Sequence, residues 1–321
     1  MKLQPWLAEA WRSLAKRLER SELPHALLFS GAAGLGKRDL ANALAAAALC
    51  ESRDQDGHAC GTCRACRLVS AGSHPDRAMV TFELRDDGKP RTEIVIEQIR
   101  NLSQRLSLSS QFGGLQIALI DPADKMNAST ANALLKTLEE PSSNTVILLI
   151  SDQPARLPAT IRSRCQRIEA GFPHFVQARD WLISKGVAAD PAEQALSATL
   201  GNPGLALKAL QEGVLELRKS CTKDLLALSA QRGSALEIAE SWAADRPSER
   251  LWHAAVVVRD EARNLARGER GILGLTGAGE IPKLTAWFAA ANRSRDLLAT
   301  QVRAELVLLD LLHTWQTPRR S

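Results

Sequence analysis

The chain has 321 residues, enough for two or three domains that each bury a core. Hydrophobic residues make up 45% and charged residues 24%, as in ordinary globular proteins, and the many Ala and Leu residues favour helices. Aromatic residues contribute 4%, with no Tyr, which argues against a nucleic-acid surface of stacked aromatic side chains. The net charge of +5 permits contact with a polyanion without requiring it, so any DNA contact should be mostly ionic.

Signals for membranes and export are missing from the sequence. No apolar run reaches 18 residues, and the N-terminus lacks the apolar core of a signal peptide. We therefore expect a cytoplasmic protein without membrane contacts. In that reducing compartment, four cysteines between positions 50 and 66 indicate a metal site rather than disulfides.

Helical and strand patterns alternate through the first 150 residues. An amphipathic helix should end before Pro24, and a short apolar strand at 26–30 leads into a Gly-rich loop and a second helix. Beyond the cysteines, the patterns predict strands at 79–84, 116–120 and 145–150 and helices at 96–106 and 129–138. This alternation predicts a largely parallel sheet covered on both faces. From about Pro173 the strand signals fade, and two all-helical parts are expected.

The Gly-rich loop after the first strand has the spacing of a phosphate-binding loop. Gly31, Gly34 and Gly36 precede Lys37, so backbone N–H groups, a helix N-terminus and an ammonium group could surround a phosphate. The next residue, where Ser or Thr would bind Mg²⁺, is Arg38, and a guanidinium cannot bind a metal ion. A phosphate-shaped loop without its metal ligand is favoured over both a plain Gly-rich turn and a competent Mg-ATP site.

The acidic half of such a site is also altered. Asp121 directly follows the strand at 116–120 and could position Mg²⁺. The next residue, where active members of the class carry Glu, is Pro122. Asp124 could substitute, although a turn or helix-capping role is more common for Asp in such a place. We expect no ATP hydrolysis, with weak nucleotide binding still open.

The cysteine cluster predicts a structural zinc site. Cys50, Cys60, Cys63 and Cys66 provide four thiolates within 17 residues, enough for a closed tetrahedral site with no open position for catalysis. His58 could replace one cysteine, and reduced thiols without metal remain the alternative. Nearby arginines at 53, 64 and 67 could offset the excess negative charge.

Three features together carry a family resemblance. These are the run from Ala131 to Pro141, the later Ser163-Arg164-Cys165, and the four-cysteine insertion after the phosphate loop. Taken alone, Arg164 would be a solvated cation or a helix C-terminal charge. Together, the features resemble the clamp-loader subunits of bacterial DNA polymerase III, which belong to the AAA+ class. The resemblance is strong over 24–168 and general in the helical remainder.

The resemblance implies three domains. These are an α/β RecA-like AAA+ domain at 1–168 with its zinc module at 50–66, a small helical lid at 169–213, and an all-α collar at 214–321 that joins five subunits into a ring. It implies partners as well: gamma/tau and delta subunits, the sliding clamp, and primed DNA through the assembled ring. No intrinsic catalysis is expected of this subunit of a DNA-directed DNA polymerase holoenzyme.

Two residues take roles from the resemblance. Arg164 would reach into the ATP site of a neighbouring subunit, where a planar, permanently charged guanidinium stabilises the transferring phosphoryl group. Gly204 stands where active relatives place a nucleotide-sensing Arg, which would be a third defect of this chain's own site.

Two alternatives stay open. An ATPase motor subunit like gamma/tau would share the cysteines and the Ser-Arg-Cys run, but Arg38, Pro122 and the lack of a long C-terminal extension argue against it. A zinc-dependent nucleic-acid adaptor would need base-reading aromatics or a basic stripe near the cysteines, and arginines occur there without aromatic partners.

Overall fold

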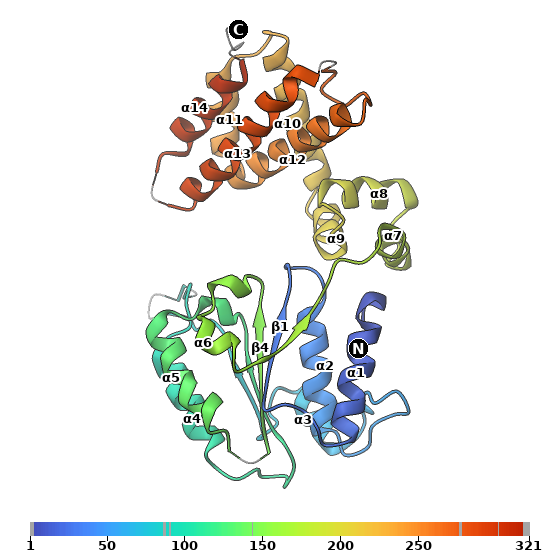
Figure 1. Ribbon diagram of the computed structural model, residues 1–321, viewed down its shortest axis with the longest axis vertical. Helices are drawn as coiled ribbons and strands as arrows, with labels where there is room; N and C mark the ends of the chain where they lie inside the picture. The colour runs from blue at the N-terminus through green and yellow to red at the C-terminus, as the bar shows by residue number, and fades with distance from the viewer. Residues whose placement is uncertain are drawn as a thin grey trace. The chain divides into compact units, whose positions relative to one another are not determined.

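The computed structural model describes residues 3–85, 88–89, 91–142, 144–275, 278–300 and 302–316. Its contacts divide the chain into two compact units (Figure 1). The first comprises Met1–Val187 and Gly201–Leu205, and the second comprises Ala188–Leu200 and Ala206–Ser321. The predicted domain boundaries near 168 and 213 stay predictions.

A five-stranded parallel sheet forms the centre of the first unit, in the order β2-β3-β4-β1-β5. The strands are β1 (Ala26–Ser30), β2 (Arg77–Val80), β3 (Gln116–Ile120), β4 (Thr145–Ser151) and β5 (Gln166–Glu169). Strands β1, β3 and β4 are buried along their whole length, as expected for a parallel sheet covered on both faces. Because these strands are parallel, the loops that follow them meet at one edge of the sheet.

Helices cover both faces of this sheet (Figure 1). One face carries α1 (Ala8–Glu19) and α2 (Lys37–Leu49), with α3 (Arg64–Ser70) packed on α2, and the other carries α4 (Ile96–Leu106), α5 (Ala128–Glu139) and α6 (Ala159–Arg162). Successive strand residues point to opposite faces, so Leu27 and Phe29 join the core under α1 and α2 while Leu28 joins the core under α4 and α5. Helix α7 (Phe175–Ser184) also belongs to this unit.

The structure corrects one expected strand and adds another that was not expected. The strand predicted at 79–84 is β2, which begins two residues earlier and ends at Val80. Strand β5 was not predicted, because its sequence Gln-Arg-Ile-Glu holds a single apolar residue and it lies at the sheet edge, where no second strand covers it. Short polar edge strands give little hydrophobic signal.

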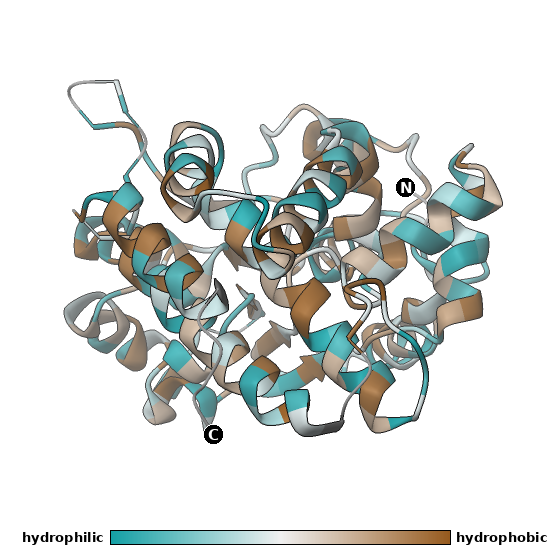
Figure 2. Cartoon of the chain, turned by 90° about the horizontal axis from the view of Figure 1, so that it is seen from above, coloured by the Kyte–Doolittle hydropathy of each residue, from teal (hydrophilic) through white to brown (hydrophobic). Residues whose placement is uncertain are grey.

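The second unit is built from helices. It contains α8 (Ala189–Ala198), α10 (Val214–Ser229), α11 (Ala235–Ala244), α12 (Pro247–Ala266), α13 (Ile281–Leu298) and α14 (Ala304–Gln316), while α9 (Pro203–Gln211) starts in the first unit and ends in the second. Its core packs Trp242, Leu251, Trp287 and Leu312. Figure 2 shows hydrophobic and hydrophilic residues mixed along the helices of the chain, as in amphipathic helices with one buried face.

Four short 3₁₀ helices complete the described elements: η1 (Pro5–Leu7), η2 (Ala123–Lys125), η3 (Pro154–Arg156) and η4 (Ala278–Glu280). Within the described residues, no helix combines the length and the apolar character that crossing a membrane requires.

Candidate functional site

The phosphate loop lies between β1 and α2 at the carboxyl edge of the sheet. Gly34 and Gly36 have φ values of 85° and 84°, a left-handed conformation that glycine adopts without steric cost. This conformation turns the chain sharply, so that α2 starts at Lys37 directly after the loop. The loop therefore has the strand, turn and helix that phosphate binding requires.

The ammonium group of Lys37 already has partners within this protein. The residue is 1% exposed, and its ammonium group donates to the Ala32 carbonyl oxygen at 3.0 Å and forms an ion pair with Asp152. Burial lowers the pKa of Lys37 below its usual value, because an isolated charge is costly inside a protein. The Asp152 carboxylate thus pairs with the ammonium group that the sequence analysis assigned to a phosphate.

Arg38 joins the two acidic loops. Its Nε donates to Asp121 at 2.8 Å, and its two terminal nitrogens donate to the two oxygens of Asp152 at 3.1 and 3.0 Å. Burial alone would raise the pKa of Asp152, but hydrogen bonds from Arg38 and Lys37 outweigh it and hold that pKa below its usual value. A guanidinium therefore neutralises both carboxylates that could otherwise attract Mg²⁺.

Asp124 lies behind this network. It is 8% exposed, and its Oδ1 accepts hydrogen bonds from the Ser151 hydroxyl at 2.7 Å and the Asp152 backbone N–H at 2.9 Å. These bonds fix the end of β4 and orient Asp152. A cavity of about 420 Å³ at this edge is lined by Arg38, Asp121 and Asp124 among others.

Two distant segments cover the outside of the loop. From the N-terminal segment, the Trp6 indole N–H donates to the Leu35 carbonyl oxygen at 2.9 Å. From the start of α9, the Asn202 amide donates to the Ala33 carbonyl oxygen at 2.7 Å. A Cβ at Gly204 would overlap the Gly34 carbonyl oxygen, so only glycine allows this close approach. Gly204, which the resemblance places where active relatives carry a sensing Arg, therefore packs backbone against backbone.

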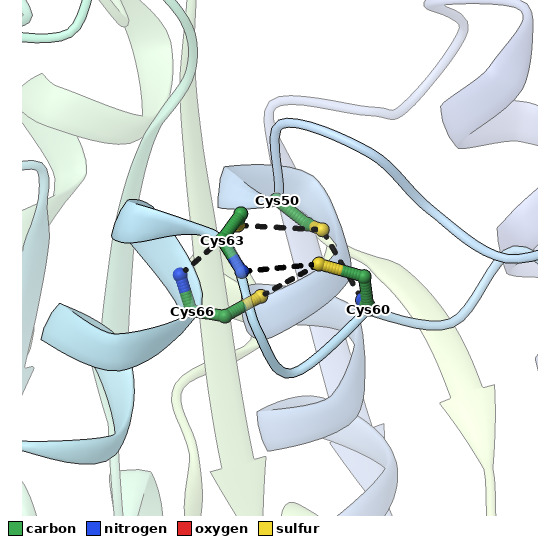
Figure 3. Close-up of side chains that lie close together, drawn as sticks. All are labelled: Cys50, Cys60, Cys63 and Cys66. Carbon is green, nitrogen blue, oxygen red and sulfur yellow. Dashed lines mark hydrogen bonds between the residues drawn. The ribbon is translucent and has the colours of Figure 1, made fainter.

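The four cysteines of the insertion converge (Figure 3). Their sulfur atoms all lie within 4.8 Å of one another, and the Cys50–Cys63 and Cys60–Cys66 sulfur pairs are 4.0 Å apart. Zn–S bonds of about 2.3 Å in a tetrahedron place sulfur atoms about 3.8 Å apart, so the cluster could hold a zinc ion.

Backbone donors surround these sulfurs, as a thiolate site requires. The N–H groups of Cys60, Cys63 and Cys66 donate to the sulfurs of Cys50, Cys60 and Cys63 respectively. Hydrogen bonds from the backbone of Thr62 and Cys63 lower the pKa of Cys60 to about 6, whereas burial raises the pKa of Cys66 to about 12. The donor set and its hydrogen bonds fit zinc.

His58, which was considered as a possible zinc ligand in place of one cysteine, contacts Trp11 instead. Its ring stacks on Trp11 of α1, with the ring centres 4.2 Å apart and an angle of 2° between the planes. The Trp11 indole N–H donates to the Asp56 carbonyl oxygen at 3.0 Å. The loop between Cys50 and Cys60 therefore packs on α1.

Among the arginines near the cysteines, Arg64 lies over the Phe112 ring, with its guanidinium carbon 5.2 Å from the ring centre.

The Ser-Arg-Cys corner follows α6. Cys165 is 8% exposed and joins the core beneath α5, whereas the Arg164 side chain is 36% exposed. The Thr160 carbonyl oxygen accepts from the Ser163 hydroxyl at 3.1 Å and from the Arg164 guanidinium at 3.0 Å. A second partner of Arg164, Glu139 of α5, lies 2.5 Å from its guanidinium. A buried Cys thus anchors an accessible Arg.

Sequence reasoning missed several partners in these sites. Asp152 follows β4 just as Asp121 follows β3, so its position after a buried strand was the available signal. Asn202 and Glu139 carried no such signal, because the residues they contact are distant in sequence or lie on another element.

Comparison with known proteins places these features in a family. A family model described as "DNA polymerase III, delta subunit" matches residues 6–172. The DNA polymerase III subunit delta' of Pseudomonas aeruginosa is 39% identical over 243 residues, which are 75% of this chain and 71% of that protein. The subunit delta' of Escherichia coli is 28% identical over 97% of this chain and 95% of its own length.

A solved structure, the DNA polymerase III gamma subunit-related protein of Thermotoga maritima, aligns over 95% of this chain and 98% of its own, with a TM-score of 0.47 and 17% identity. The parallel sheet, the four-cysteine cluster and the helical C-terminal region agree with the α/β AAA+ fold class predicted from the sequence. Because the family match covers just over half of the chain and the Pseudomonas aeruginosa relative is similar over most of both proteins, the chain belongs to the DNA polymerase III delta' subunits of the clamp-loader AAA+ class.

Proposed function

We propose that this protein is a clamp-loader subunit that does not hydrolyse ATP itself and that supplies Arg164 in trans to a neighbouring ATPase subunit. Its partners would be gamma/tau and delta subunits, and the assembled ring would load the sliding clamp onto primed DNA. Membership of the delta' family supports the assembly, since its members are named as DNA polymerase III subunits.

The observation that carries the non-hydrolysing role is the Arg38 network. Phosphoryl transfer needs Mg²⁺ between the phosphates and the acidic strand end. Arg38 stands at the metal-ligand position and bonds to Asp121 and Asp152, so the carboxylates face a guanidinium. Lys37 is paired as well, and a phosphate would have to displace a carboxylate that already neutralises a buried charge.

Arg164 has the properties that a trans-acting arginine needs. Its side chain is 36% exposed, while buried neighbours fix its backbone, so the guanidinium is available at a defined place on the surface. A guanidinium keeps its charge at any physiological pH and can hydrogen-bond two phosphate oxygens at once. The four-cysteine site would hold structural zinc, and the helical C-terminal region, proposed as a collar from residue 214, would join the subunits.

The second candidate is an active gamma/tau-like motor subunit. This candidate is supported by the complete Gly31-x₄-Gly36-Lys37 spacing, with glycines of the loop in the left-handed conformation. Such a subunit would turn over ATP when isolated, which the non-hydrolysing role excludes.

The test is single-turnover ATP hydrolysis in an assembled loader in which only the site next to Arg164 can hydrolyse. Arg164→Ala should slow that site greatly, because an arginine finger contributes about 10³- to 10⁵-fold at one site. Arg164→Lys should rescue little, since an ammonium lacks the planar fork.

Arg162→Ala is the matched control, because this neighbouring exposed arginine makes no ion pair among the described residues. Sizing of each loader confirms assembly. An unchanged rate with Arg164→Ala in an intact ring would show that Arg164 is only a surface cation.

A further inference from the structure

A carboxylate holds Arg164 in one orientation. The Nη2 atom of Arg164 lies 2.5 Å from Oε1 of Glu139, and Nη1 donates to the Thr160 carbonyl oxygen at 3.0 Å. The two contacts come from different elements, since Glu139 is the last residue of α5 and Thr160 belongs to α6. The hydrogen bond to Thr160 and the ion pair with Glu139 together restrict where the guanidinium can lie.

Both contacts are attached to the core of the sheet domain. Leu138, next to Glu139, is 2% exposed, and Ile161, next to Thr160, is 0% exposed. Cys165 is buried on the other side of Arg164. The Glu139 backbone therefore cannot shift without disturbing packed side chains, and a site held by packed elements is more precise than one on a free loop.

We infer that Glu139 is a positioning residue for Arg164, which rests on the proposed trans role of that arginine. A guanidinium has five N–H donors, and the Thr160 carbonyl oxygen accepts from one of them while Glu139 pairs with the charge, so N–H groups remain for a phosphate of the neighbouring subunit. A long arginine side chain otherwise samples many rotamers, and holding it in advance removes that entropy cost from the transition state. Glu139 thus acts through Arg164 without touching the nucleotide.

The adjacent residue provides an internal comparison. Glu140 carries the same charge one position further along, but it makes no ion pair among the described residues. Any effect of local negative charge alone should therefore appear equally in variants of both residues, whereas positioning requires Glu139.

The experiment measures single-turnover hydrolysis at the site next to Arg164 in the assembled loader, over a range of ATP concentrations. Glu139→Ala should lower the maximal rate about twofold to fivefold, the range expected for a half-exposed ion pair. The ATP concentration for half-maximal rate should not change, because Arg164 acts in the transition state. Glu139→Gln, which keeps an acceptor oxygen, should lose less, and Glu140→Gln should match the unmodified loader.

A double-variant cycle separates positioning from general structural damage. In a loader that carries Arg164→Ala, adding Glu139→Ala should have no further effect, because the residue to be positioned is gone. A rate that is unchanged or raised by Glu139→Ala, or an equal loss in both backgrounds, would overturn the positioning role while leaving the function of Arg164 intact. If Arg164→Ala itself has no effect, the proposed function fails first.

Discussion

Two buried titratable residues of this protein, Lys37 and His253, differ in whether the protein supplies hydrogen-bond partners. Lys37 keeps its place at 1% exposure because Asp152 and the Ala32 carbonyl oxygen accept its N–H groups. His253 in α12 is 3% exposed, and its Nδ1 has no hydrogen-bond partner among the described residues. A paired cation is tolerated inside, whereas an unpaired imidazole stays neutral.

We expect His253 to make the stability of the protein depend on pH. Burial lowers its pKa to about 4, and repulsion from Arg218, Arg246 and Arg295 adds to the effect. An unfolded chain has a histidine pKa of about 6.5, so as the pH falls below that value the unfolded state binds the proton first. The free energy of unfolding should therefore fall between about pH 6.5 and 4, and the full stability should be present above this window.

Urea unfolding at a series of pH values from 7.5 to 4.5 measures this change in the free energy of unfolding. His253→Gln, which cannot titrate, should lose roughly 2 to 3 kcal/mol less over that range than the unmodified protein, as the difference between the folded and unfolded pKa values implies. Equal pH slopes for the two proteins would show that His253 does not titrate differently in the folded state.

Elements bring together side chains that the sequence keeps apart. Lys37, Asp121 and Asp152 follow β1, β3 and β4, which lie side by side in the sheet. The carboxyl ends of parallel strands meet at one edge, so three loops supply one ion-pair network. The cysteine insertion likewise contacts a segment distant in sequence, since its loop packs on α1 through the stacked rings of His58 and Trp11.

Zinc removal tests that element. We expect one zinc per chain, held by Cys50, Cys60, Cys63 and Cys66, and chelation should loosen the insertion while the sheet stays folded on its own core. Elemental analysis gives the metal content. Hydrogen exchange should then speed up at 50–70 and in α1, with β1, β3 and β4 remaining protected.

Protein purified without chelator and free of metal would contradict the zinc site. Unfolding of the whole chain on chelation would contradict the local effect. Cys221→Ser is a suitable control, because this buried cysteine belongs to the helical unit and should leave the zinc content unchanged.

For the whole molecule, the prediction is that the isolated chain hydrolyses ATP no faster than background. Arg38 stands where the proposed function expects no Mg²⁺ ligand, and the Asp121 and Asp152 carboxylates are paired with it. A coupled or radiometric ATPase assay with and without Mg²⁺ measures the rate. Turnover that depends on Mg²⁺ and disappears in Lys37→Ala would favour the gamma/tau-like alternative.

The sequence by itself determined the order of the first four strands, the spacing of the Gly-rich loop with Arg38 after Lys37, and the four cysteines. Each of these depends on local spacing: apolar periodicity, glycines at fixed intervals, or thiols close in the chain. The tertiary structure alone decided that Asp152 neutralises Lys37, that Gly204 packs on Gly34, and that Glu139 holds Arg164. These contacts join residues from different strands and helices, and no pattern within one segment specifies which loops a parallel sheet brings together.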